Sequence, residues 1–267
     1  MTTTRRRTPV GLLIPACGAV ALIVLPLVGL LQRAPWSDVW SELSTPEIGQ
    51  ALRLSLVCSL GALAVAVVLG VPLAWVLARV PFRGRSLLRA LVTLPMVLPP
   101  VVGGVALLYA FGRRGFLGRH FGDLPGFPLP FTTRAVILAE AFVAMPFLIV
   151  TVEAGLRQMN QRYEEAAATL GAGPWRRFWT ITVPLIAPSL AAGAALCWAR
   201  ALGEFGATIT FAGNLPGRTQ TMPSAIYVSL ESRPEGAIVL SLVLLAVSLA
   251  VLIGLRGRLL DADGSGR

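Results

Sequence analysis

The chain has 267 residues, of which 55% are hydrophobic and only 13% charged, and its mean hydropathy is +0.73. Soluble domains carry about 25% charged residues, so this composition excludes a soluble globular protein and indicates a membrane protein. All 23 basic residues are Arg and the net charge is +10; the absence of Lys excludes a Walker A phosphate loop and Schiff-base chemistry. His120 is the single histidine, which excludes a His-based zinc site. We expect Cys17, Cys58 and Cys197, far apart in apolar stretches, to be buried as small hydrophobic residues.

Six apolar stretches are long enough to cross a membrane, because a helix rises ~1.5 Å per residue and the hydrocarbon core is ~30 Å thick. They lie at about residues 10–31, 51–78, 87–111, 135–156, 181–205 and 237–255. The sequence therefore predicts an all-α integral membrane protein, with six transmembrane helices in a single domain over residues 1–267.

The first span follows three arginines at residues 5–7, as the core of a signal peptide would. Its apolar run is longer than the usual stretch of about 7–15 residues and no small-residue cleavage site follows, so we expect a retained helix. With the N-terminus in the cytoplasm, 14 arginines fall on the inner side and eight fall outside or at the outer edge, three of them in the outer loop at residues 113–119. We therefore predict that both termini are cytoplasmic.

Proline is frequent inside the spans. Each proline removes a backbone hydrogen bond, so we expect kinked or broken helices wherever neighbouring segments can satisfy the backbone. Kinked helices suit a transport pathway, although they also occur in static bundles. The prolines concerned are Pro15, Pro26, Pro72, Pro95, Pro99, Pro100, Pro146, Pro184 and Pro188.

Residues 157–180, between the fourth and fifth spans, have the pattern of two short helices. The first has an apolar face, and the Gly-Ala-Gly-Pro sequence at residues 171–174 then ends it and begins the second helix. The second helix brings the aromatic side chains of residues 175–179 together. This helix–turn–helix is either a docking site for another protein or an amphipathic connector on lipid headgroups. The apolar face consists of Leu156, Met159, Tyr163, Ala166, Ala167 and Leu170.

This loop resembles the EAA signature of ABC importer permeases: Glu-Ala-Ala, three residues, Gly, nine residues, then Ile-x-Leu-Pro. The chain matches it at Glu165, Ala166, Ala167, Gly171, Ile181 and Pro184, with Val183 in place of Leu. The resemblance implies the type I permease fold of ABC importers, with a coupling loop (residues 157–180) that docks on a separate ATP-hydrolysing subunit. It makes Glu165 a polar contact with that subunit, and Gly171 the residue that permits the sharp turn. The missing Lys agrees with this assignment, because the ATP chemistry then belongs to the partner.

Two further regions resemble the molybdate-type permeases of this family. They are residues 94–104, followed by 111–115, and residues 201–227. Sulfate and thiosulfate permeases share the Gly-Glu-Phe-Gly core at residues 203–206, whereas residues 214–227 are closer to the molybdate branch. The resemblance implies import of molybdate into the cytoplasm by alternating access, with tungstate and sulfate or thiosulfate as alternative substrates.

Polar side chains near the end of the fifth span are candidates for the translocation pathway. Arg200 and Glu204 share a helix face, and an unpaired Arg within the membrane costs roughly 2.5–3.5 kcal/mol. Arg200 either meets a dianion on its route or forms a structural ion pair with Glu204, and we favour the ion pair because Glu204 would repel an oxyanion. Thr208, Thr210 and Asn214 offer neutral donors near the outer mouth, where they either pass the oxyanion or satisfy local backbone groups.

A basic outer loop carries Arg113, Arg114, Arg119 and His120. It either steers a dianion electrostatically or contacts an acidic docking surface on a delivery protein, and we favour the second interpretation.

Two other classes of function fit the sequence less well. A membrane-embedded enzyme lacks support, because the chain has no Lys, one loop His and no clustered metal ligands. A secondary transporter usually has ionisable residues deep in several spans, whereas Glu140, Glu153, Arg200 and Glu204 lie toward span ends.

The resemblance also implies the partners. These are a second permease chain, two ABC ATPase subunits, an extracytoplasmic molybdate-binding protein and membrane lipid, with no role for nucleic acid. The permease pair is expected to be a homodimer, since heterodimers are more typical of sulfate systems. We expect no catalytic residue, cofactor or metal in this chain, because ATP and magnesium are used by the ATPase. The expected location is a bacterial cell membrane.

Overall fold

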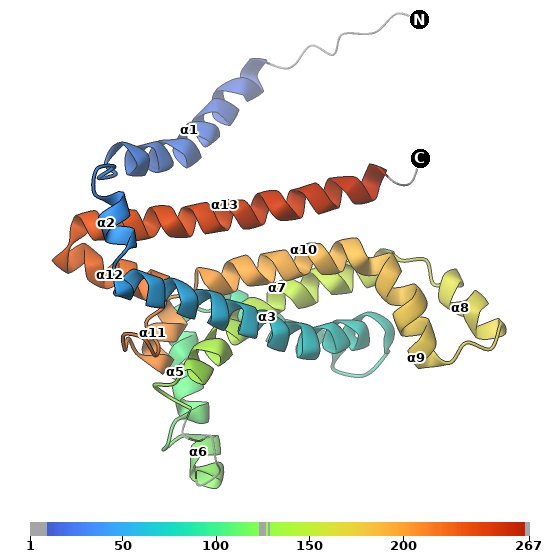
Figure 1. The fold of residues 1–267 in the computed structure, drawn as a ribbon. Helices are drawn as coiled ribbons and strands as arrows, with labels where there is room; N and C mark the ends of the chain where they lie inside the picture. Colours follow the sequence, from blue (N-terminus) through green and yellow to red (C-terminus); the bar gives the residue numbers. More distant parts are fainter. Residues whose placement is uncertain (1–9, 123–126, 128, 265–267) are drawn as a thin grey trace, which may run out of the picture.

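The computed structural model describes residues 10–122, 127 and 129–264, and it is built from helices (Figure 1). The helices are α1 (Val10–Gln32), α2 (Val39–Leu43), α3 (Pro46–Arg79), α4 (Arg85–Val97), α5 (Pro100–Phe111), α6 (Phe116–Phe121), α7 (Thr133–Gln158), α8 (Arg162–Thr169), α9 (Pro174–Arg177), the π-helix η1 (Phe178–Thr182), α10 (Val183–Leu202), α11 (Gly206–Ala212), α12 (Met222–Ser232) and α13 (Pro234–Gly264). The helices α3, α7 and α10 pack together and form the centre of the bundle (Figure 1).

Five helical segments are long and apolar enough to cross a membrane, and the bent pair formed by α4 and the segment that follows it makes a sixth. The five are Gly11–Gln32, Pro46–Arg79, Thr133–Gln158, Pro174–Leu202 and Pro234–Val251. Their positions follow the apolar stretches of the sequence, so the predicted all-α architecture with six spans is confirmed.

The third span is not one continuous helix over residues 87–111. It breaks after Val97 and resumes at Pro100, and the two parts are bent by 117°. Leu98 and Pro99 adopt extended backbone conformations, because a residue that precedes proline is disfavoured in the helical region. Two consecutive prolines therefore divide this span into two parts, α4 and α5.

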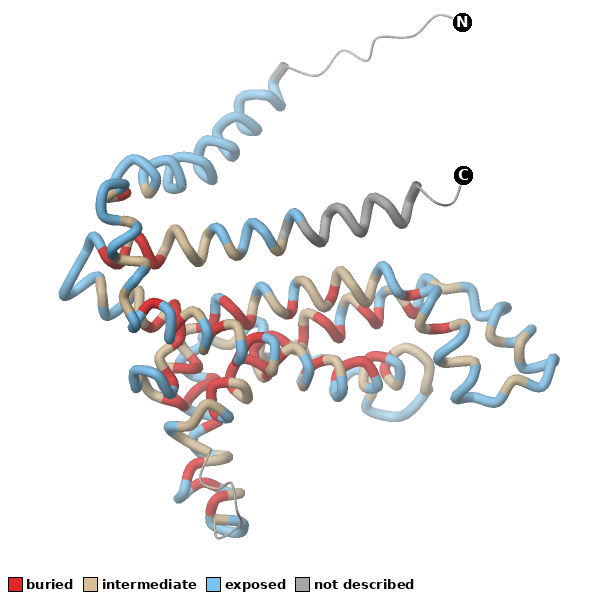
Figure 2. Tube along the Cα trace, in the orientation of Figure 1, coloured by how far each residue is buried: buried red, intermediate tan, exposed pale blue. Residues whose placement is uncertain are grey.

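The central helix α7 is the most buried of the candidate spans (Figure 2). It packs against both α3 and α10, which also contact each other. Within a bilayer the hydrophobic effect does not drive helices together, so small residues that allow close approach are needed at such interfaces. At Gly155 a Cβ atom would lie only 2.5 Å from Cβ of Ser189 on α10. Gly155 is therefore required for the close contact between α7 and α10.

We predict that Gly155→Val lowers the stability of the folded chain, because overpacking of a tight contact costs about 1–3 kcal/mol. In a chain of this size that cost lowers Tm by several degrees, at roughly 2–4 °C per kcal/mol. Thermal unfolding in detergent measures the change, with Gly18→Val as the matched control, since Gly18 has no atom within 4 Å of its would-be Cβ. Equal Tm values for the two variants would contradict the packing argument.

The first helix, α1, stands apart from the bundle, and its described side chains are exposed almost throughout (Figure 2). Its apolar surface suits hydrocarbon, as expected for a helix in contact with lipid. This placement corrects one prediction: Cys17 on α1 is exposed, whereas Cys58 and Cys197 are buried as expected. Hydropathy alone does not distinguish a helix packed in a bundle from one that faces lipid.

The start of α1 and the end of α13 lie on the side of the bundle where α8 and α9 project (Figure 1). A chain that crosses a membrane an even number of times has both termini on the same side, and the observed arrangement agrees with this. The arginines at residues 5–7 and at 267, which contributed to the predicted orientation, lie outside the described residues.

Candidate functional site

The helices α8 and α9 form a short hairpin that projects from one end of the bundle (Figure 1). Gly171, in the turn between them, has a φ of +82°, a left-handed conformation that favours glycine. Pro174 occupies the first turn of α9, where its missing N–H is not needed. The helix–turn–helix predicted over the coupling loop is thus present, with the turn at the expected residues.

One part of that prediction is wrong. Residues 156–170 do not form one continuous apolar face, because α7 ends at Gln158 and α8 begins only at Arg162. Between them the Asn160 side chain accepts a hydrogen bond from the backbone N–H of Arg162 at 3.1 Å, a local turn that competes with the helix. Leu156 consequently belongs to the buried side of α7, whereas Leu170 lies at the exposed tip of the hairpin.

The outer surface of the hairpin combines exposed apolar and polar side chains. Leu170 is 88% exposed and Trp175 74%, and Glu165 beside them is exposed as well. Trp175 stacks on Phe178 with ring centroids 6.0 Å apart, and Trp179 meets both rings edge-on. Leu170 lies outside the candidate spans, whereas Trp175 lies in the first turn of the candidate span that begins at Pro174. Large exposed apolar side chains mark a contact with another protein or with a membrane, and the hairpin presents a surface of this kind.

The remaining residues of the EAA pattern lie elsewhere. Ala166 is exposed on α8 and Ala167 is partly covered, while Ile181 lies in the π-helix η1 and Pro184 in the first turn of α10. The wider π turn lies directly before Pro184, which cannot donate a backbone hydrogen bond. The pattern thus covers both the exposed hairpin and the point where the hairpin joins α10.

Sequence reasoning missed Glu164, which faces the bundle. Its Oε1 accepts a hydrogen bond from the Thr182 hydroxyl at 2.5 Å, and its Oε2 lies 3.4 Å from Nη2 of Arg79 at the end of α3. An acidic residue directly before the motif was visible in the sequence, but its partners lie 18 and 85 positions away.

A second ionic group lies at the same end of the bundle. Glu153 on α7 is approached by Nη2 of Arg89 at 2.6 Å and by Nη2 of Arg157 at 2.8 Å, and its side chain is 7% exposed. Because Arg89 belongs to α4, this group ties the first part of the broken span to the central helix. Charges near the ends of membrane spans are expected to be paired in this manner.

The predicted contact between Arg200 and Glu204 is present, with Nη1 of Arg200 2.6 Å from Oε2 of Glu204. The Glu204 side chain is buried, and its Oε1 also accepts the backbone N–H of Ala207 at 2.9 Å. The carboxylate therefore links the end of α10 to the start of α11. Whether the pair also meets the transported species stays a prediction.

The three neutral candidates of the pathway differ in what their polar atoms do. Thr210 donates to the backbone oxygen of Gly206 at 2.7 Å, so its hydroxyl satisfies its own helix. Thr208 Oγ1 and Asn214 Oδ1 are buried and have no hydrogen-bond partner among the described residues. In α7 the buried Glu140 likewise has an unpartnered Oε2 within the described part of the chain. Thr208 and Asn214 thus have polar atoms that the described residues do not satisfy, and their role on the translocation pathway stays a prediction.

The basic outer residues cluster on and beside α6, which projects from the bundle beyond α5 (Figure 1). All four side chains are exposed. Arg119 Nε donates to the backbone oxygen of Arg114 at 2.9 Å, and the His120 ring contacts the Phe116 oxygen at 2.8 Å. The arginines Arg113 and Arg114 make no side-chain ion pair with any described residue.

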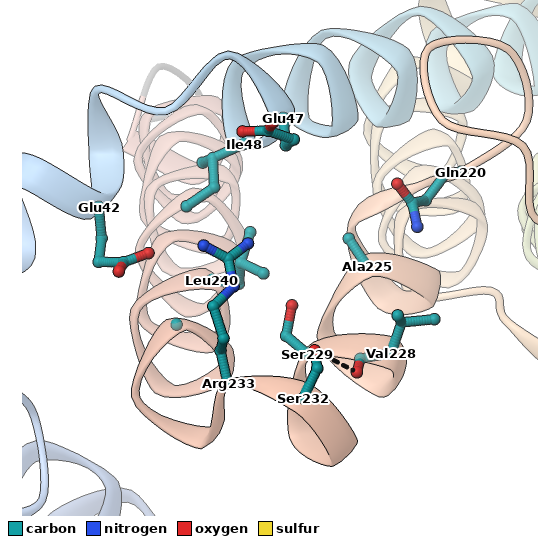
Figure 3. A pocket seen from close by; sticks show the side chains of 11 residues that line it. Glu42, Glu47, Ile48, Gln220, Ala225, Val228, Ser229, Ser232, Arg233 and Leu240 are labelled. Atoms are coloured by element: carbon teal, nitrogen blue, oxygen red, sulfur yellow. Dashed lines mark hydrogen bonds between the residues drawn. The ribbon is translucent and has the colours of Figure 1, made fainter.

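A pocket of about 180 Å³ lies between α2, α3, α12 and α13 (Figure 3). Its charged lining residues are Glu42, Glu47 and Arg233, so its net charge is negative and it disfavours a dianion. Within the described residues, no group of three or more His, Cys, Asp or Glu side chains is placed to hold a metal ion.

Comparisons with known proteins identify the family. Residues 66–262 match the family described as "Binding-protein-dependent transport system inner membrane component". The chain is 44% identical over 247 residues to the molybdenum transport system permease protein ModB of Mycobacterium tuberculosis, covering 92% of each chain. It is 36% identical over 239 residues to the sulfate transport system permease protein CysT of Escherichia coli, covering 88% of this chain and 86% of the relative.

The fold is shared with a solved structure, that of a bacterial alginate ABC transporter in complex with an alginate pentasaccharide-bound periplasmic protein. The TM-score is 0.74 at 18% identity, covering 92% of this chain and 91% of the other. This likeness confirms the predicted permease fold of ABC importers. The chain therefore belongs to the family of inner membrane components of binding-protein-dependent transport systems, and it is a multi-pass transport component rather than an enzyme.

Proposed function

We propose that this chain is the permease subunit of an ATP-driven importer for molybdate, which moves the oxyanion into the cytoplasm by alternating access. The observation that carries the proposal is the α8–α9 hairpin, which exposes Glu165 and Ala166 of the EAA pattern together with the apolar side chains of Leu170 and Trp175. The substrate is supported by the relative named a molybdenum permease, at 44% identity over 92% of this chain. The sulfate permease is more distant at 36% identity, so sulfate is the alternative substrate, together with tungstate.

The assembly follows from the same hairpin. Each chain has one hairpin, and the ATPases of this transporter class work as pairs, so two copies of the permease and two ATPase subunits are proposed. An extracytoplasmic binding protein delivers the oxyanion, in agreement with the name of the family. ATP and magnesium are held by the ATPase partners, and residues 157–180 are the coupling loop within a single permease domain.

The proposed orientation places α8, α9 and both termini in the cytoplasm. Closure of the ATPase pair then moves the hairpin, and the hairpin moves the spans, because η1 continues directly into α10. The break between α4 and α5 allows the inner and outer parts of the third span to move separately. These movements open the route to one side of the membrane at a time.

We predict that the double variant Arg113→Gln and Arg114→Gln weakens delivery by the binding protein. Losing two exposed charges mainly slows electrostatically guided association, so the binding-protein concentration needed for half-maximal uptake should rise roughly tenfold. The effect should shrink at high salt, because charges in solvent are screened. Unchanged uptake at every binding-protein concentration would leave these arginines without a role in delivery.

The experiment that tests the proposed function is uptake of radiolabelled molybdate into vesicles that contain the permease, a candidate ATPase and a candidate binding protein. ATP-dependent uptake that tungstate blocks and sulfate does not would agree with the proposal. Competition by sulfate would move the substrate to the sulfate branch. Uptake without ATP dependence in a complete assembly would contradict the role of the coupling loop.

A further inference from the structure

Glu164 joins the α8–α9 hairpin to two spanning helices at once. One carboxylate oxygen accepts the Thr182 hydroxyl at 2.5 Å, and the other lies 3.4 Å from Nη2 of Arg79. Thr182 is buried at the end of η1, directly before α10, and Arg79 is the last residue of α3. Because α3 and α10 both pack against α7, this single side chain connects α8 to two helices that contact the central helix.

Helix α8 needs such a connection, because its own backbone links to the bundle are interrupted, whereas α9 continues through η1 directly into α10. Helix α8 has only eight residues, with a break before it at residues 159–161 and the Gly171 turn after it. A helix this short is not stable by itself in water. The other side-chain hydrogen bonds of α8 in the described chain are local, such as Thr169 to the backbone oxygen of Ala166. Without Glu164, a push on α8 would reach α10 only across the Gly171 turn and α9, and no other side-chain hydrogen bond or ion pair of α8 among the described residues leads to α3.

The two adjacent glutamates of α8 lie in different environments. Glu165 is exposed and makes no ion pair with a described residue, whereas the Glu164 side chain is 20% exposed and the Arg79 side chain facing it only 10%. Successive residues point about 100° apart around a helix, so one can face a partner while the other faces the bundle. Arg79 has no other carboxylate within ion-pair distance among the described residues, which makes Glu164 its counter-charge.

We infer that Glu164 is a positioning residue that transmits movement of the hairpin to α3 and α10 through Arg79 and Thr182. The inference rests on the proposed ATP-driven function and goes beyond it. Docking is assigned to Glu165 and the exposed apolar residues, while transmission is assigned to Glu164. Loss of docking separates the ATPase from the permease. Loss of transmission leaves an assembled complex in which ATP hydrolysis no longer drives transport.

The test compares Glu164→Ala with Glu165→Ala in the assembled transporter in vesicles, with molybdate as the transported probe. Glu164→Ala should retain the ATPase subunits and lower the molybdate taken up per ATP hydrolysed about tenfold, within the range of typical coupling between sites. Glu165→Ala should instead lower the amount of ATPase bound. The charge exchange Arg79→Glu with Glu164→Arg should restore uptake per ATP above either single variant, since a threonine hydroxyl both donates and accepts.

A second measurement separates this inference from the proposed function. Amide hydrogen exchange of residues 165–169 in the full permease chain needs neither ATP nor substrate, and it should be about fivefold faster in Glu164→Ala. The control is Gln161→Ala, which alters an exposed side chain that makes no cap hydrogen bond. Unchanged hydrogen exchange, unchanged uptake per ATP, or failure of the charge-swapped double variant to restore uptake would each overturn the inference.

If the unaltered assembly shows no ATP-dependent uptake, the proposed function fails and transmission fails with it. Hydrogen exchange still decides in that case whether Glu164 holds α8.

Discussion

We expect Leu170→Glu to separate the permease from its ATPase partner and to lower ATP-dependent uptake roughly 100-fold. Leu170 is 88% exposed at the tip of the α8–α9 hairpin, so the substitution removes no contact within the permease itself. In a docked complex the new carboxylate would replace an apolar contact, and burying an uncompensated charge costs several kcal/mol. A loss of about 2.7 kcal/mol corresponds to a 100-fold change in affinity.

Co-purification of the ATPase with the tagged permease measures this effect directly, alongside uptake in vesicles. Phe116→Glu is the matched control, because Phe116 is 73% exposed and lies on α6 rather than on the hairpin. The control should retain the ATPase at the level of the unaltered chain. Retention of the ATPase by Leu170→Glu at that same level would remove Leu170 from the docking surface.

The parts of the fold that the sequence predicts are those set by local pattern. Spans follow from runs of apolar residues, and the turn at residues 171–174 follows from the conformations that Gly and Pro prefer. The break at Pro99 and Pro100 was likewise foreseeable, because proline interrupts helices. The angle of 117° between α4 and the segment that follows it could not be predicted from the sequence, because it depends on how α5 packs against α11.

The parts that the sequence does not predict depend on which helices become neighbours. Arg89 meets Glu153 across 64 positions, and Arg79 meets Glu164 across 85, so neither pair leaves a pattern within one helix. The exposure of Cys17 has the same origin, because α1 is as apolar as the buried helices but does not pack against them. By contrast, Arg200 and Glu204 are four residues apart, and their predicted contact is present. The shared helix face that was expected for them is wrong, because α10 ends at Leu202 and Glu204 lies between α10 and α11.

We expect Glu204→Gln to destabilise the chain strongly through the Arg200 charge that it leaves behind. Glutamine keeps the size of the side chain and an oxygen that can accept the Ala207 N–H, so the change removes little beyond the counter-charge. An unpaired Arg within a span costs roughly 2.5–3.5 kcal/mol, which lowers Tm on the order of 5–10 °C in a chain of this size. Thermal unfolding in detergent and the amount of folded chain in membranes both report this loss.

The double variant Arg200→Gln with Glu204→Gln tests whether the pair is structural. If the charge left behind is the cause, removing it as well should restore most of the Tm lost by Glu204→Gln, with an interaction energy of about 0.5–3 kcal/mol between the two changes. Additive losses would show instead that each residue acts separately. Uptake measured per folded complex then addresses Arg200: a loss that persists after stability returns would place Arg200 on the route of the oxyanion, whereas recovery together with Tm would make it a structural residue that holds α10 against α11.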